Sequence, residues 1–94
     1  MAELFVKVHF NNKTNSFTHE TNIKPEKLSD IIWDFLSTQE GKGKDERKPN
    51  EQEVYDVELH LDLSEDLFSI SDNCGNHSLR DGILMYFARN LNNG

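Results

Sequence analysis

Apolar and polar residues alternate without interruption over residues 55–63. A period of two is typical of a β-strand with one face buried and the other face in solvent. The apolar positions predict the buried face: Tyr55, Val57, Leu59, Leu61 and Leu63. The polar positions predict the open face: Asp56, Glu58, His60 and Asp62. A turn at 64–66 and a return strand at 67–71, with Phe68 and Ile70 facing inward, complete a predicted hairpin.

Patterns of the same kind predict four further elements. Residues 4–10 alternate as a first strand, and a shorter second strand follows at 17–21 after a polar turn. Pro25 suits the first turn of a helix, and apolar residues at three- and four-residue spacing predict that helix over 25–39. A capping box formed by Ser78 and Asp81 predicts the start of a closing helix. Its apolar stripe consists of Leu79, Ile83, Leu84, Phe87 and Leu91.

The resulting order, ββαββα, predicts an α+β fold. Its economical architecture is one mostly antiparallel four-stranded sheet with both helices packed on one face. The 94 residues form a single domain, 1–94, with one modest core. The order contains two hairpin-plus-helix units in tandem, but we detect no repeat of individual residues that supports a duplication.

Residues 40–52 form a neutral segment, because their four basic and four acidic side chains cancel. Gly41 and Gly43 end the preceding helix, and no apolar periodicity follows them. Loop length adds closure entropy only logarithmically. We therefore expect a mobile charged loop at 40–52 that is dispensable for folding.

The formal net charge of −7 lies entirely outside this loop. Such a surface repels phosphates, so direct nucleic-acid binding is disfavoured, and it attracts a basic protein partner. No apolar run approaches a membrane span, and the N-terminus lacks a signal-peptide pattern. The single cysteine, Cys74, cannot form an internal disulfide, which favours a reducing compartment. We expect a cytoplasmic protein that does not enter membranes.

The polar face of residues 55–63 is the best candidate for a binding surface. Phe5, Lys7 and His9 of the first strand are predicted to share it. An exposed Phe5 among polar residues is the kind of anchor that binding sites use. The alternative is a solvated face without a function, which antiparallel sheets commonly show.

The first predicted helix carries a second acidic row. Glu26, Asp30 and Asp34 lie four residues apart on one face, where like charges repel. Glu26 also gains from the positive end of the helix dipole. Trp33 either flanks the core or lies exposed beside these carboxylates. The row is therefore a second candidate for partner binding.

Neither a metal site nor a catalytic site is predicted. Residues 62–73 begin like a calcium-binding loop, but Leu67 stands at its glycine position and Asn73 at its glutamate position. His60 and Asp62 lie two apart on a strand without a paired histidine motif. We expect a non-enzymatic protein without a metal, a cofactor or catalytic residues.

One local stretch resembles a known family. Residues 68–75, FSISDNCG, follow a strand, precede a helix and resemble the adenine-binding box of the GHKL (Bergerat-fold) ATPases. Residues 28–34, LSDIIWD, resemble that family's helix with its glutamate and magnesium-binding asparagine. The resemblance implies adenine contacts from Asp72 and Gly75, and it places Asp30 and Asp34 at the glutamate and asparagine positions.

Two departures limit what this resemblance implies. Asp34 replaces the asparagine, and the chain ends before an ATP lid. The implied activity is therefore nucleotide binding by a remnant of the fold, without ATPase activity. An Asp-Asn-x-Gly sequence also forms ordinary turns, since Asp and Asn bond to nearby backbone and Gly accepts positive φ.

Two function classes follow. The first is a small acidic protein-binding module: an adaptor, an immunity or inhibitor protein, or a nucleic-acid mimic that blocks a nucleic-acid-handling enzyme. The second is a nucleotide-binding remnant built around Asp72 and Gly75. A homodimer is compatible with the first class. A stoichiometric basic partner would separate the two.

Overall fold

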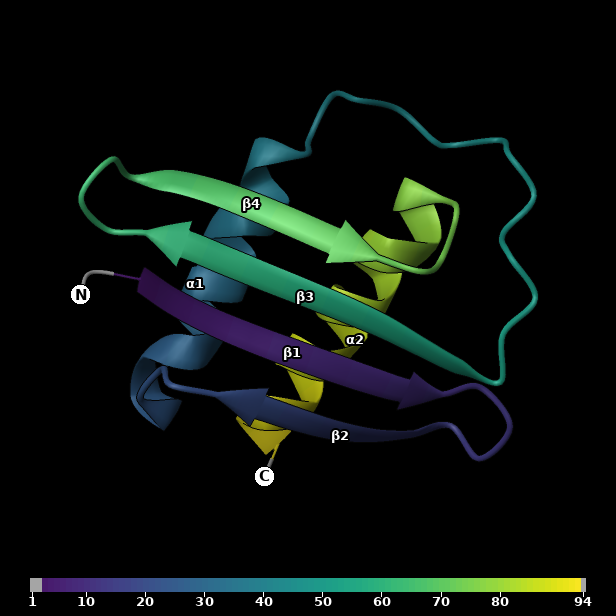
Figure 1. The fold of residues 1–94 in the computed structure, drawn as a ribbon, viewed down its shortest axis with the longest axis horizontal. Helices are drawn as coiled ribbons and strands as arrows, with labels where there is room; N and C mark the ends of the chain where they lie inside the picture. The colour runs from purple at the N-terminus through teal and green to yellow at the C-terminus, as the bar shows by residue number, and fades with distance from the viewer. Residues whose placement is uncertain (1–2, 94) are drawn as a thin grey trace.

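A computed structural model describes residues 3–93 and shows a four-stranded sheet with two helices behind it (Figure 1). The elements are β1 (Glu3–Asn11), β2 (Ser16–Thr21), α1 (Pro25–Thr38), β3 (Val54–Asp62), β4 (Leu67–Asp72) and α2 (His77–Asn93). The sheet order is β2-β1-β3-β4, and every neighbouring pair is antiparallel. The predicted ββαββα order and α+β class are confirmed. Within the described residues, neither helix has the length and apolar character needed to cross a membrane.

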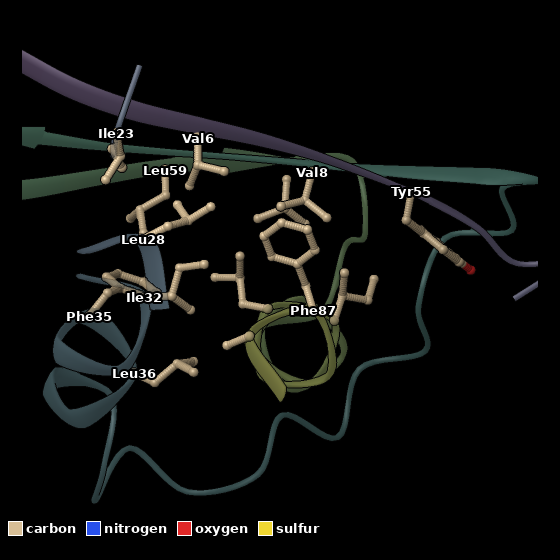
Figure 2. Close-up of a cluster of buried hydrophobic side chains, with 14 of the residues drawn as sticks. Val6, Val8, Ile23, Leu28, Ile32, Phe35, Leu36, Tyr55, Leu59 and Phe87 are labelled. Carbon is tan, nitrogen blue, oxygen red and sulfur yellow. The ribbon is translucent and has the colours of Figure 1, made fainter. Parts of the chain in front are cut away.

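The core lies between the sheet and the two helices (Figure 2). The inward positions of the central strands β1 and β3 are almost fully buried: Val6, Val8, Val57 and Leu59. They pack against one buried face of each helix, which includes Ile32 of α1 and Leu84 of α2. Phe68 and Ile70 of β4 are partly buried against this core, as predicted. The inward prediction for Leu63 is wrong, because β3 ends at Asp62 and Leu63 is 51% exposed in the turn.

Two hairpin turns of the same geometry join β1 to β2 and β3 to β4. Asn15 and Asp66 each have φ of 55°, the left-handed region that Asn and Asp tolerate better than other side chains. The Oδ1 atom of Asn11 accepts the N–H of Lys13 at 2.9 Å. The Oδ1 atom of Asp62 accepts the N–H of Ser64, also at 2.9 Å. Both turns are therefore closed by the side chain of the last strand residue.

The strands of the two halves of the chain occur at the same spacing. Strand β3 begins and ends 51 residues after β1, and β4 begins and ends 51 residues after β2. At this spacing the chain has Val6 with Val57 and Phe17 with Phe68, but most paired positions differ. The repeat therefore lies in the positions of the strands, whereas the residues at equivalent positions mostly differ.

Side-chain hydrogen bonds follow the same spacing. Asn22 Oδ1 accepts the N–H of Phe5, and Asn73 Oδ1 accepts the N–H of Asp56, both at 2.8 Å. The Nδ2 atom of Asn22 also donates to the carbonyl of Glu3 at 3.0 Å, and that of Asn73 donates to the carbonyl of Val54 at 3.1 Å. Two hairpin-plus-helix units with the same internal bonds thus face each other across the β1–β3 pair. We name them unit 1 (residues 3–38) and unit 2 (residues 54–93).

The axis relating the units passes through the middle of the sheet. Lys7 and Glu58 are equivalent positions of the two units, and they are also partners in the β1–β3 register. An antiparallel pair in which equivalent residues face each other has an approximate two-fold axis at that point. Figure 1 shows the consequence, with β2 and β4 as the two outer strands.

Helix α2 begins differently from the prediction. The Oδ1 atom of Asn76 accepts the N–H of Leu79 at 3.0 Å, so Asn76 caps the helix and the capping box of Ser78 and Asp81 is wrong. Ser78 Oγ instead accepts the N–H of Asp45 at 2.8 Å. The reason is a tertiary contact. The Ser78 hydroxyl, which the capping box required, accepts a hydrogen bond from Asp45 of the distant loop instead.

The charged loop is attached to this end of α2. The carboxylate of Asp45 accepts the N–H of His77 at 3.0 Å, and the side chain of Asn76 donates to the carbonyls of Asp45 and Arg47. Hydrogen bonds from Arg47 hold the pKa of Asp45 far below its ordinary value. The loop thus contains no helix or strand, yet its middle contacts the start of α2.

Candidate protein-binding face

The uncovered face of the sheet carries most of the residues predicted for partner binding. The helices lie on the opposite side, so the outward positions of β1 and β3 form its centre. The register pairs Phe5 with His60, Lys7 with Glu58, and His9 with Asp56 across the two strands. The structure therefore brings together five sequence-predicted residues: Phe5, Asp56, Glu58, His60 and Asp62. We call this surface the open face.

Ion pairs connect the side chains of the open face. Lys7 Nζ lies 3.4 Å from Glu58 Oε1. The two ring nitrogens of His60 lie 2.7 Å from Glu3 Oε1 and 2.8 Å from Glu58 Oε2. His9 Nδ1 lies 2.5 Å from Asp56 Oδ1. Lys7 and His9 of the neighbouring strand thus contact the predicted row of carboxylates.

These contacts shift the acidity of the groups at the centre of the face. The hydrogen bond from His60 is the largest cause that lowers the pKa of Glu58, with Lys7 contributing as well. The hydrogen bond to Glu58 is the largest cause that raises the pKa of His60, and Glu3 adds to it. Both ring nitrogens face carboxylates, which requires two N–H donors. The geometry therefore favours the imidazolium form of His60.

Phe5 differs from its expected role as an exposed anchor. It is half-buried, its ring centroid lies 6.1 Å from that of His60, and Lys7 Nζ lies 5.9 Å from its centroid. The neighbouring polar side chains therefore cover part of its ring. Phe5 therefore forms a flat apolar part of the open face and does not protrude from it.

Asp62 lies at the end of the open face and has a local partner. Its Oδ1 accepts the backbone N–H of Ser64 at 2.9 Å and the hydroxyl at 2.6 Å. These hydrogen bonds lower the pKa of Asp62. Asp62 thus stabilises the β3–β4 turn, and substituting it would test the turn as well as binding.

Two acidic residues of the open face were missed in the sequence. Glu3 is the first residue of β1 and pairs with His60, and Glu20 of β2 lies opposite Lys7. Extending the alternation of the first strand by one residue would have placed Glu3. Glu20 could be placed only from the β1–β2 register, which sequence patterns do not provide.

A hollow of about 220 Å³ lies at one end of the open face. Its lining comes from β1, β3, β4 and the residue after β4, and includes Lys7, His9, Asp56, Glu58, Ser71 and Asn73. Lys7 and His9 are already paired with the two carboxylates. The hollow therefore offers hydrogen-bond acceptors and a hydroxyl to a partner side chain.

The acidic row of α1 lies elsewhere. Glu26, Asp30 and Asp34 are exposed, and helical spacing places them opposite the buried positions Leu28 and Ile32. They face away from the sheet, so the structure does not bring the two predicted acidic rows onto one surface. Trp33 beside them is partly buried against the core, which agrees with the core-flank alternative.

The turn containing Asp72 and Gly75 is filled by the chain itself. Asp72 Oδ1 accepts the N–H of Cys74 at 2.8 Å. A Cβ atom on Gly75, whose φ is 72°, would lie 2.7 Å from the side chain of Asn50. Asn50 also donates its N–H to the Cys74 carbonyl and its amide to the Asn73 carbonyl. Side-chain packing explains the glycine here without a ligand.

The residues of the nucleotide-binding resemblance lie on different elements. Asp30 and Asp34 are exposed residues of α1, whereas Asp72 is the last residue of β4. Cys74 is fully buried, and burial raises the pKa of its thiol to about 12. A buried, protonated thiol is a core residue, not a nucleophile.

Neither a search for metal-binding groups nor comparisons with known proteins gave a further indication of function. Among residues 3–93, no group of three or more His, Cys, Asp or Glu side chains has a spacing that could hold a metal ion. In comparisons with known proteins, the chain matches no family model, no curated protein and no solved structure.

Proposed function

We propose that this protein is a small acidic binding module, without catalytic activity, that engages a basic surface of a protein partner through its open face. The observation that carries the proposal is the charge of that uncovered face. Its described residues include five outward carboxylates against two cationic groups, Lys7 and His60: Glu3, Glu20, Asp56, Glu58 and Asp62. An acidic face attracts a basic partner over a long range and speeds encounter.

The finer proposal concerns the class of partner. Alternate residues on a strand are about 6.6 Å apart, so Asp56 and Glu58 form a regular series of negative groups. A nucleic-acid-handling enzyme presents lysine and arginine at regular intervals to contact phosphates. The module would occupy such a surface as an inhibitor or nucleic-acid mimic.

The test removes charge from the open face and keeps its shape. The variant Asp56→Asn with Glu58→Gln lowers the negative charge by two, and the matched control Glu40→Gln with Glu46→Gln makes the same change within the loop. We chose these positions because Asp62 and Asp45 have structural hydrogen bonds. The partner is first isolated from the source cell with the wild-type protein, then identified and purified.

Binding to the purified partner is then measured at several salt concentrations. We expect the open-face variant to bind about tenfold more weakly, since two interface charges worth roughly 0.7 kcal/mol each give that factor. The loop control should keep its affinity, and the wild-type association rate should fall as salt rises. Equal affinity for the two variants would show that the open face is only a solvated surface.

A further inference from the structure

The two equivalent hairpin turns have opposite chemistry. The first turn region, residues 12–16, has the sequence NKTNS, and the second, residues 63–67, has the sequence LSEDL. Both turns use φ of 55° at their fourth residue and a side-chain acceptor from the preceding strand residue. Because the polar sequence forms the same turn, the backbone does not require leucine or acidic residues in the second one.

Leu63 and Leu67 are exposed and lie outside the hydrophobic core. They are 51% and 59% exposed, the two highest values among the large apolar residues that the structure places in solvent. Their equivalents in unit 1 are Asn12 and Ser16, which are polar and exposed as well. Unit 1 therefore serves as an internal control, and the two leucines are additional to what the fold needs.

Acidic residues surround the two leucines. Asp62 precedes them, and Glu65 and Asp66 lie between them, whereas the first turn contains one lysine and no acid at 12–16. Leu67 also lies next to Asp62 in the β3–β4 register, and Asp62 is opposite Glu3 in the β1–β3 register. The turn is therefore continuous with the open face and shares its charge.

We propose that the β3–β4 turn is the anchor of the binding module, with Leu63 and Leu67 entering an apolar pocket of the partner that is rimmed by lysine or arginine. This inference rests on the proposed function and names the part of the partner that the module recognises. Buried apolar side chains at the centre of an interface, with charges around them, are the usual source of binding energy.

The test exchanges the chemistry of the two turns. The variant Leu63→Asn with Leu67→Ser gives the second turn the residues that unit 1 has at the same places, so we expect it to fold with unchanged stability. The matched control, Asn12→Leu with Ser16→Leu, adds leucines to the other turn. We expect the first variant to bind the purified partner at least tenfold more weakly, and the control to bind like the wild type. Should the double variant fail to fold, Leu67→Ser alone is measured.

A second measurement locates the contact directly. A photoreactive benzophenone side chain is placed at position 67 in one protein and at position 16 in another, and each is irradiated with the purified partner. Crosslinking from position 67 to a partner peptide that contains lysine or arginine supports the anchor. Equal crosslinking from both positions, or none from position 67, overturns it.

The outcomes separate this inference from the proposed function. If Asp56→Asn with Glu58→Gln loses affinity but Leu63→Asn with Leu67→Ser does not, the open face binds and the anchor is wrong. The reverse result supports the anchor and removes the centre of the open face from the interface. Failure of the wild-type protein to capture any partner overturns both proposals.

Discussion

His60 determines the charge at the centre of the open face, because it lies between two carboxylates. With both ring nitrogens near oxygen atoms of Glu3 and Glu58, the protonated ring neutralises part of the local negative charge. When the ring loses its proton, the net charge of this site becomes more negative by one. One hydrogen bond to a carboxylate is lost as well. The stability of the fold and the charge offered to a basic partner are therefore coupled at one residue.

The pH dependence of stability follows from the direction of this shift. The pKa of His60 is raised above its ordinary value of 6.5 in the folded protein. Its protonation therefore stabilises the fold fully at pH values below 6.5, and that stabilisation is lost as pH rises through the folded pKa. We expect the free energy of unfolding to fall over this window, and the fall to be smaller in His60→Gln.

Urea unfolding of both proteins from about pH 5 to about pH 8 measures this difference, and NMR titration of the ring gives the pKa of His60 directly. Glu58 does not confuse the result, because its pKa is lowered from 4.5 and its contribution changes only at more acidic pH. A His60 pKa below 6.5 would contradict the proposed ion pairs.

Sequence patterns placed single residues well only where one strand decides their orientation. Alternation was sufficient to put Asp56, Glu58 and His60 on the uncovered face. It could not show that Lys7 and His9 partner these carboxylates, because cross-strand neighbours depend on the β1–β3 register. The side chains of the binding face were thus predictable, and their electrostatic environment was not.

At the scale of elements, local patterns predicted the strands and α1 to within one residue, and the start of α2 less well. No end of strands β1 to β4 lies more than one residue from its predicted position, since periodic burial defines the strands. The start of α2 was misplaced because Asn76 and Ser78 are both capping residue types. The choice between them depends on Asp45, which is distant in sequence and bonds to Ser78 and His77.

The contacts of the loop sharpen the prediction that residues 40–52 are mobile. Asp45 and the Arg47 carbonyl are bonded to the start of α2, whereas Lys42 precedes this attachment. Proteases cut segments that open easily. We expect trypsin to cut first after Lys42, and later after Lys44 and Arg47, since the N–H of Asp45 is bonded to Ser78.

Mass spectrometry of the early fragments tests this order. In Asp45→Ala, which removes the carboxylate from the start of α2, cleavage after Arg47 should become as fast as cleavage after Lys42. Early cleavage of the wild-type protein after Arg47 would mean that these hydrogen bonds do not order the loop in solution.

At the scale of the whole molecule, the two units share one core. Leu59 and Leu63 belong to the same alternating pattern of residues 55–63, and comparing them tests where this core ends. Leu59 is 1% exposed and Leu63 is 51% exposed. We expect Leu59→Ala to lower the free energy of unfolding by about 2–5 kcal/mol, as truncations of buried leucines do. Leu63→Ala should change it by less than about 0.5 kcal/mol.

Denaturant unfolding of both variants measures these values. Similar losses for the two would mean that Leu63 packs against the core and that the end of β3 is misplaced. Two large effects would also remove Leu63 from consideration as a binding residue, which links this measurement to the anchor proposed for the β3–β4 turn.

The fold class and the tandem order of two hairpin-plus-helix units were predictable from sequence, but the equivalence of individual positions in the two units was not. Few identical pairs, such as Val6 with Val57 and His9 with His60, occur at the spacing of 51 residues, and the burial pattern permits any apolar residue at the inward positions. The repeat is preserved in backbone geometry and in the bonds of Asn22 and Asn73. Such features become comparable only when both units are seen in three dimensions.

The central position of the β1–β3 pair has a consequence for the order in which the chain folds. Each hairpin closes a turn of a few residues, whereas β1 and β3 meet only after the whole of α1 and the loop have been brought around. Closure entropy grows with the length of chain enclosed, so each hairpin can form early and the central pair is the slow, long-range step. We expect changes in this pair to slow folding, and changes on the outer surface of α1 to act on the unfolding rate instead.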